Sequence, residues 1–274
     1  SNDNFSWSTD FNLSINKSKV VALVNDADVF NNGAPSYFSV DRSNVLRVGE
    51  EVGLFYGFEY AGVYQGGALP AGTVVIPGGV AGDPLFTDVD GSGDYGADDR
   101  TIIGNPNADY TFGFTNNFTY KNFDLNIFFQ GSQGGDIFNM TNVQLFNGDA
   151  NTTREYYNNA WTSANTDTNF PRVGNNSNRE ISSRFVEDGS YIRLKNIALG
   201  YNLPSDISSK LGMDSVRLTL SGQNLLTITD YSGLDPEVNY AGASGSNNTS
   251  RNTVNGFDFG NYPTIKSVNF SINI

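Results

Sequence analysis

An acidic segment in the first half of the chain has the residue spacing of a calcium-binding loop. Its oxygen-bearing residues occupy the positions that an EF-hand loop uses for ligands, and Gly93 stands at the sharp turn in the middle. The expected ligands are Asp88, Asp90, Ser92, Asp94 (through its backbone carbonyl) and Asp99. Hard oxygen ligands wrapped around one cation favour calcium over magnesium. The spacing therefore predicts a structural calcium site.

The same loop also has a plainer interpretation. Ser92 stands where a carboxylate is common, and Asp99 is shorter than the glutamate usual at the last position. Asp-Gly repeats form solvated turns without any metal. If calcium does bind, its loss should loosen the loop that precedes the strand expected from Tyr110 and leave the rest of the fold intact.

The rest of the composition leaves little room for covalent chemistry. The 274 residues include no cysteine and no histidine, which excludes disulfides, thiolate nucleophiles and histidine bases. Glu187 with Asp188, and Asp235 with Glu237, are acid pairs of the type that glycosidases use, but Asp235-Pro236 is also typical of a turn. We expect no enzymatic activity. The net charge of −13 also disfavours nucleic-acid binding.

Alternation of apolar and polar residues predicts long β-strands. The apolar members of these runs are Phe5, Trp7, Phe11, Leu13, Ile15; Tyr110, Phe112, Phe114, Phe118, Tyr120; Phe123, Leu125, Ile127, Phe129; Val216, Leu218, Leu220; and Val268, Phe270, Ile272, Ile274. The longest runs, 5–15 and 110–120, have eleven residues each, enough for a tilted strand to cross a bilayer, whereas strands of soluble sandwiches usually have about five or six. Because both architectures alternate, the pattern alone leaves a membrane barrel and a soluble sandwich open.

The connections between the predicted strands alternate in length, as they do between the two sides of an outer-membrane barrel. The long ones, expected to be extracellular, are 65–109, 132–190 and 227–264, and the short ones are 121–122 and 203–213. Residues 16–53 break the alternation. They form either a folded element or an extra strand pair through 20–24 and 45–48. Short helices are expected at 154–161 and 205–211.

Several segments together resemble the SusC/RagA-like TonB-dependent receptors. They are RFVEDGSYIRLKNIALGYNLP (184–204), SGQNLLTITDYSGLDPE (221–237), VGEEVGLFYGF (48–58), the acidic loop with RTIIGNP (88–106) and GNYP (260–263). The resemblance covers nearly the whole chain in the family's order. It implies an all-β fold, with residues 1–274 forming the C-terminal part of a transmembrane antiparallel β-barrel of about seven long strands, and a plug domain that is absent from this chain.

The resemblance also implies a function. Such receptors import nutrient oligomers, glycans or peptides, across the outer membrane of Bacteroidota-type bacteria. The implied partners are TonB (through the plug), a SusD-like lipoprotein over the extracellular loops, outer-membrane lipid and the transported oligomer. The alternative from the residues themselves is a secreted, calcium-stabilised β-sandwich adhesin or binding module, with a secreted glycan hydrolase as a distant third.

Two basic residues lie inside a predicted strand, where Arg193 and Lys195 alternate with Ile192 and Leu194. A charge on the lipid face of a barrel costs about 2–4 kcal/mol at the midplane. We therefore expect both side chains to face the lumen, pairing with plug acids or lining the substrate path. The alternative is a position near the rim.

Aromatic residues in the long connections are candidates for contact with a substrate or a lid. They are Tyr156, Tyr157, Trp161, Tyr231 and Tyr240. Aromatic rings stack on sugar rings, but they equally pack loops against one another. The sequence leaves both roles open.

Overall fold

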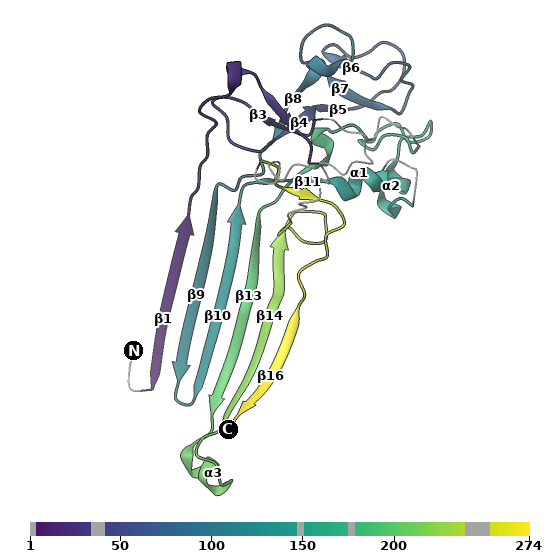
Figure 1. Cartoon of the computed structure of the whole chain (residues 1–274). Coiled ribbons are helices and arrows are strands. Elements are labelled where there is room, and N and C mark those ends of the chain that lie inside the picture. Colours follow the sequence, from purple (N-terminus) through teal and green to yellow (C-terminus); the bar gives the residue numbers. More distant parts are fainter. Residues whose placement is uncertain (1–3, 34–41, 147–150, 175–178, 239–252) are drawn as a thin grey trace.

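A single six-stranded antiparallel sheet dominates the computed structural model, which describes residues 4–33, 42–146, 151–174, 179–238 and 253–274 (Figure 1). Its strands, in spatial order, are β1 (Phe5–Ser14), β9 (Tyr110–Tyr120), β10 (Phe123–Gln133), β13 (Tyr191–Asn202), β14 (Arg217–Thr229) and β16 (Ser267–Asn273). Strands make up 43% of the described residues and helices 12%, which confirms the predicted all-β class.

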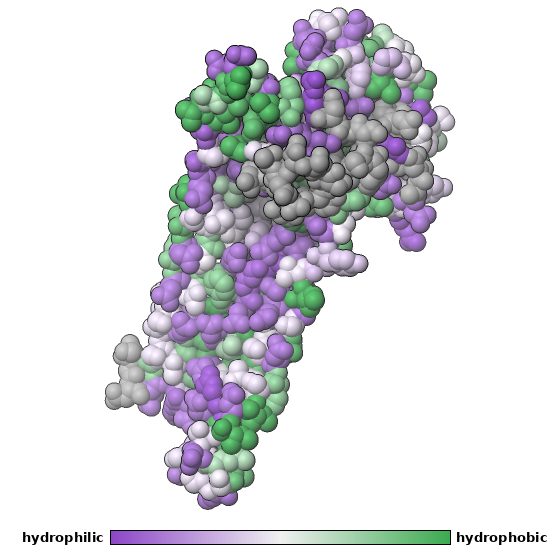
Figure 2. Space-filling model, viewed as in Figure 1, coloured by the Kyte–Doolittle hydropathy of each residue, from purple (hydrophilic) through white to green (hydrophobic). Residues whose placement is uncertain are grey.

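The two faces of this sheet differ in chemistry because residues opposite each other on paired strands share a face. One row across all six strands is apolar and runs through Trp7, Phe118, Leu125, Leu199, Leu220 and Phe270. The next row, on the other face, consists of Ser6, Thr119, Asp124, Gly200, Thr219 and Ser271. Hydrophilic residues gather over the middle of the sheet in Figure 2.

The apolar face is uncovered. Trp7, Leu220 and Phe270 are 58%, 51% and 64% exposed, and no second sheet among the described residues packs on them. A soluble β-sandwich would bury this face against its second layer. A barrel wall instead turns an apolar outer face toward lipid and a polar inner face toward the lumen. The sheet therefore favours the partial barrel over the sandwich.

All three long connections leave the same end of the sheet (Figure 1). They comprise residues 15–109, 134–190 and 230–266, and together we call them the crown. The opposite end carries only the Lys121-Asn122 turn and residues 203–216, which contain the predicted short helix, α3 (Ser205–Lys210). Lys121 has a φ of 51°, the left-handed conformation that such tight hairpin turns need.

One part of the predicted topology is wrong. The sequence suggested about seven barrel strands, with a loop at 65–109, but β1 pairs directly with β9 and the described sheet has six strands. Residues 48–58 contain the short strand β4 (Leu54–Phe58), which belongs to the crown. Residues 16–53 and 65–109 are thus parts of one long connection. The alternation of long and short connections is therefore unbroken.

The crown contains three small sheets and two short helices. The first sheet joins β2 (Val29–Asn31), β3 (Asn44–Leu46), β4 and β8 (Arg100–Gly104); the second joins β5 (Tyr60–Val63), β7 (Pro84–Thr87) and β6 (Thr73–Val74); the third joins β12 (Val186–Asp188), β11 (Asp136–Asn139) and β15 (Phe257–Asp258). The helices are α1 (Met140–Phe146) and α2 (Arg154–Asn159), of which only α2 was predicted. The described part of residues 16–53 therefore contains folded structure: 45–46 lie in β3, but 20–24 form no strand.

One aromatic core holds the three connections together. Phe55 comes from the first connection, Phe138 from the second and Phe257 from the third, and all three are 0% exposed. Their ring centroids lie 5.7 Å (Phe55–Phe138), 5.1 Å (Phe55–Phe257) and 5.5 Å (Phe138–Phe257) apart. The crown is therefore packed as one unit. Among the described residues, no helix is both long and apolar enough to span a membrane.

Candidate functional site

The acidic loop between β7 and β8 gathers three carboxylates. Oxygen atoms of Asp88, Asp90 and Asp99 all lie within 4.8 Å of one another. Asp99 is fully buried, and its two oxygens accept hydrogen bonds from the backbone N–H of Val89 (3.0 Å) and of Gly96 (2.8 Å). The carboxylate at the last predicted ligand position is therefore fixed by the backbone of its own loop.

The first half of the loop has the turn that the sequence predicted. Gly93, with a φ of 78°, donates its N–H to Oδ2 of Asp88 at 3.0 Å, and Oδ1 of Asp88 is buried without a hydrogen-bond partner. The Ser92 N–H donates to Asp90 at 2.8 Å and lowers the pKa of that carboxyl. A buried, unpartnered carboxylate oxygen beside two more carboxylates is a chemical environment that suits a divalent cation.

The other two predicted ligands, Ser92 and Asp94, are hydrogen-bonded to each other. The Ser92 hydroxyl donates to the backbone carbonyl of Asp94 (3.1 Å) and accepts the Asp94 N–H (3.2 Å). The carboxylate cluster thus consists of Asp88, Asp90 and Asp99. The two further oxygens predicted as ligands, the Ser92 hydroxyl and the Asp94 backbone carbonyl, form a hydrogen bond with each other.

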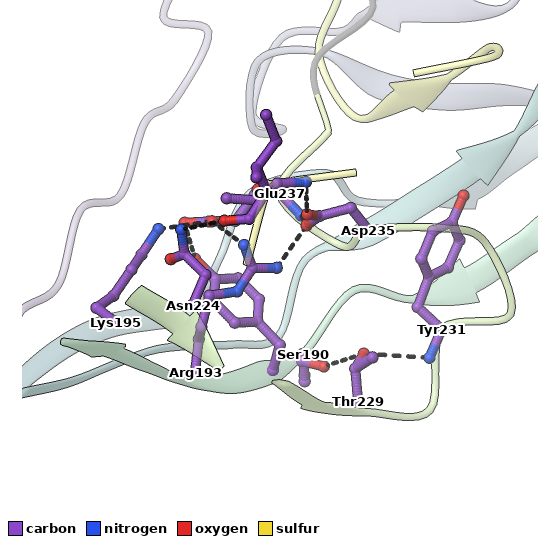
Figure 3. A network of polar contacts seen from close by, with 11 residues as sticks. Ser190, Arg193, Lys195, Asn224, Thr229, Tyr231, Asp235 and Glu237 are labelled. Atoms are coloured by element: carbon purple, nitrogen blue, oxygen red, sulfur yellow. Dashed lines mark hydrogen bonds and ion pairs between the residues drawn. The ribbon is translucent and has the colours of Figure 1, made fainter. Parts of the chain in front are cut away.

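A second polar cluster lies where the crown meets the inner face of the sheet (Figure 3). Arg193 on β13 is 2% exposed, and its guanidinium donates to Asp235 at 2.5 Å and to Glu237 at 2.7 Å. Lys195 donates to the same oxygen of Glu237 at 2.7 Å, and the Tyr191 hydroxyl donates to its other oxygen at 2.9 Å. Two acids of the last connection are thereby held by three side chains of one strand.

An irregularity in β13 makes this arrangement possible. The register shifts at Lys195 on both sides of the strand, so Lys195 has no partner in either ladder. Leu194 is paired with Phe129 and Leu226 on the apolar face, so Arg193 points to the polar face. The expected inward direction of Arg193 and Lys195 agrees with this geometry. Their acidic partners come from the same chain, whereas the sequence suggested plug acids or an open substrate path.

Asp235 also binds the backbone on both sides of this cluster. Besides Arg193, its carboxylate accepts the backbone N–H of Glu237 (2.9 Å) and of Thr264 (2.7 Å). Burial by itself would raise the pKa of Asp235, but the hydrogen bonds from Arg193, Thr264 and Glu237 hold it well below its usual range. Asp235 therefore stays ionised and ties both ends of the last connection together.

The predicted substrate-contacting aromatics take different positions. Tyr156 is fully buried, stacks on Phe146 with centroids 4.6 Å apart and donates its hydroxyl to the Pro171 carbonyl at 2.9 Å. Tyr231 is 5% exposed and donates to Asp258 at 2.5 Å. These two pack the crown, as the alternative interpretation held.

Two of the other three candidates lie nearer the surface. Tyr157 is 72% exposed, so its ring is available at the surface. Trp161 is half-buried and donates its indole N–H to Gln65 at 3.0 Å. Tyr240 lies outside the described residues.

Sequence reasoning missed a hollow of about 590 Å³ in the crown, bordered by Tyr60, Phe146, Phe170, Arg184 and Glu187 among others. The Arg184 guanidinium lies 5.2–5.6 Å from the centroids of four rings, those of Tyr60, Phe146, Tyr156 and Phe185. Burial raises the pKa of Tyr60 to about 12. No linear motif could mark this hollow, because its walls come from all three connections.

Known proteins similar to this chain are TonB-dependent receptors. No family model matches. TonB-dependent receptor P3 of Formosa agariphila is 48% identical over 274 residues, and P26 of the same organism is 32% identical over 278. TonB-dependent receptor SusC of Bacteroides thetaiotaomicron is 26% identical over 246 residues, 85% of this chain and 22% of SusC. The chain spans only 27% of P3 and of P26, although those matches cover 100% and 99% of it.

Solved structures of the RagAB peptide transporter have a similar fold. The structure of the RagAB peptide transporter matches 99% of this chain and 27% of its own, with a TM-score of 0.73 and 23% identity. The RagAB peptide importer in its "open-open" state matches equally well, at 24% identity. The six-stranded sheet and its crown are thus an arrangement that already occurs within a larger solved chain.

Proposed function

This chain belongs to the SusC/RagA-like TonB-dependent receptors, and from that premise we propose that it forms part of the wall and the extracellular crown of an outer-membrane importer of nutrient oligomers. One observation supports the proposal most strongly. The sheet has an exposed apolar row that crosses all six strands and a small or polar row beside it on the other face. That division suits a wall between lipid and a wet lumen.

The wall needs further strands. In the described sheet β1 and β16 are the edges, and an unpaired strand edge in lipid leaves backbone groups unsatisfied at several kcal/mol each. The relatives are about four times as long as this chain, since it spans 27% of them. We assign the closing strands, and the plug through which TonB would act, to such additional sequence.

The crown is the proposed meeting place with a SusD-like lipoprotein. It lies at one end of the sheet, and its three connections share one core, so it offers a firm docking surface on the outer side. The transported class is glycan or peptide oligomers; the similarity to the RagAB peptide transporter supports the peptide alternative. Transport involves no covalent step at these residues, and we assign no enzymatic role.

We assign a structural calcium ion to Asp88, Asp90 and Asp99. The support is the 4.8 Å cluster with its unpartnered Asp88 oxygen, and the loop geometry that fixes Asp99. Bound calcium would offset two of the three negative charges held close together and hold the loop onto the start of β8.

Cell fractionation followed by uptake assays tests the proposal. The polypeptide that contains residues 88–105 should appear in the outer-membrane fraction with a mass several times 29.7 kDa, together with a co-purifying lipoprotein. Deleting its gene should abolish uptake of one glycan or peptide oligomer and spare the others. A soluble polypeptide of about 29.7 kDa would refute the importer, and the secreted calcium-bound module would replace it.

A further inference from the structure

The strap formed by residues 235–238 closes one side of a hollow between the crown and the inner face of the sheet. The hollow has a volume of about 370 Å³, and Pro236 and Val238 line it opposite Tyr191 and residues 134–136. No helix or strand includes the strap. Its position therefore depends on side-chain contacts.

Those contacts are mainly ionic. Asp235 and Glu237 accept hydrogen bonds from the side chains of Arg193, Lys195 and Tyr191 and from the Thr264 backbone. Next to the strap, Leu234 is 73% exposed and adds little apolar packing. We propose that Arg193, Lys195, Asp235 and Glu237 form a latch that holds the strap on the wall, and that opening the latch opens the hollow.

The latch has an inner and an outer half. The inner pair is sequestered, because the side chains of Arg193 and Asp235 are 2% and 6% exposed. The outer pair is accessible to water, since the side chains of Lys195 and Glu237 are 23% and 24% exposed. Removing Arg193 would leave Asp235 as an uncompensated buried charge, which favours release of the strap into water. Removing Lys195 destabilises the latch less, because Glu237 keeps its hydrogen bonds from Arg193 and Tyr191.

A thiol reporter on the strap tests the latch in the full-length receptor, purified in detergent and without other reactive cysteines. Val238→Cys places the reporter, and the rate of maleimide labelling is measured. Arg193→Gln should raise this rate at least about 30-fold, because a buried hydrogen-bonded charge pair loses one partner. Lys195→Met should raise it about 2- to 5-fold, the range of a partly exposed pair.

The matched control is Arg217→Gln. Arg217 forms a 2.7 Å ion pair with Asp124 on the same inner face, but the side chains are 37% and 36% exposed. Labelling at position 238 should change less than about 2-fold in this variant. Equal labelling in the Arg193→Gln and Arg217→Gln receptors would overturn the latch, as would fast labelling of the Val238→Cys receptor alone.

A triple variant resolves the case in which Arg193→Gln fails to fold. Arg193→Gln, Asp235→Asn and Glu237→Gln together remove the stranded charges, and the two changes from acid to amide keep side-chain size. The folded fraction is read from gel mobility before and after heating. The folded triple variant lacks the ion pairs of the latch, so it should still label faster than the Val238→Cys receptor, and labelling at the unmodified rate would refute the latch.

Discussion

Truncating Phe138 to alanine is expected to unlock the crown while leaving the sheet intact. Phe138 is fully buried, and its ring contacts Phe55 and Phe257 from the two other connections. A buried aromatic side chain removes about 150–250 Å² from water, which at about 25 cal/mol per Å² is about 4–6 kcal/mol. Core Phe→Ala substitutions usually cost about 3–5 kcal/mol, and we adopt that range.

Hydrogen exchange read by mass spectrometry measures this loss locally in the full-length receptor. When closing is faster than exchange, 3–5 kcal/mol corresponds to roughly 150- to 5,000-fold faster exchange. The increase should appear in peptides from β4, β11 and β15, which belong to all three connections, and should be small in β9 and β10. Tyr157→Ala, at a residue that is 72% exposed, is the control and should change nothing. Faster exchange confined to β11 would refute the shared core.

Three further outcomes are expected. Adding calcium should raise the midpoint of thermal unfolding of the crown or its resistance to protease. Asp99→Asn should abolish this response, whereas Asp98→Asn, at an exposed residue outside the cluster, should keep it. The same response in both variants would exclude the site. In the membrane, Ile197→Arg on the apolar face should cost about 2–4 kcal/mol and lower the folded amount on gels, while Ala198→Arg on the inner face should cost less; equal losses would contradict the assigned faces. Folding lowers the pKa of Asp235, so the stability that its carboxylate gives the latch is complete above the ordinary Asp pKa of about 3.9 and is lost as the pH falls toward the pKa of the folded state. Hydroxyl-radical footprints of residues 234–238 should therefore be the same at pH 7 and pH 5. Opening already at pH 5 would contradict a lowered pKa.

The long strands were predictable because their signal is local. Alternation over about ten residues identifies a strand and its two faces without knowledge of its neighbours. The error concerned Leu54–Phe58, a short apolar run that looks like part of a barrel strand but is buried in the crown. Periodicity cannot distinguish a barrel strand from a short strand of the crown, since both are β-structure. The direct pairing of β1 with β9 is what places Leu54–Phe58 outside the large sheet.

The two polar clusters also differ in how far apart their residues lie in the sequence. The acidic loop was predicted as a unit because its residues follow one another in sequence, and three of them do converge. The direction of Arg193 was also predicted, from the cost of charge in lipid. Its partners were not, because Asp235 lies 42 positions along the chain and a strand irregularity at Lys195 decides which side chains can reach it.

The shared aromatic core also limits how such receptors can diversify. Phe55, Phe138 and Phe257 each belong to a different connection, yet each contacts the other two. Exchanging a single connection between two receptors would transplant a new surface and, with it, one third of a core that no longer matches. Chimeras should therefore be built by moving all three connections as a cassette, with crossover points in β1, β9, β10, β13, β14 and β16. The strands can then stay constant while the whole crown changes.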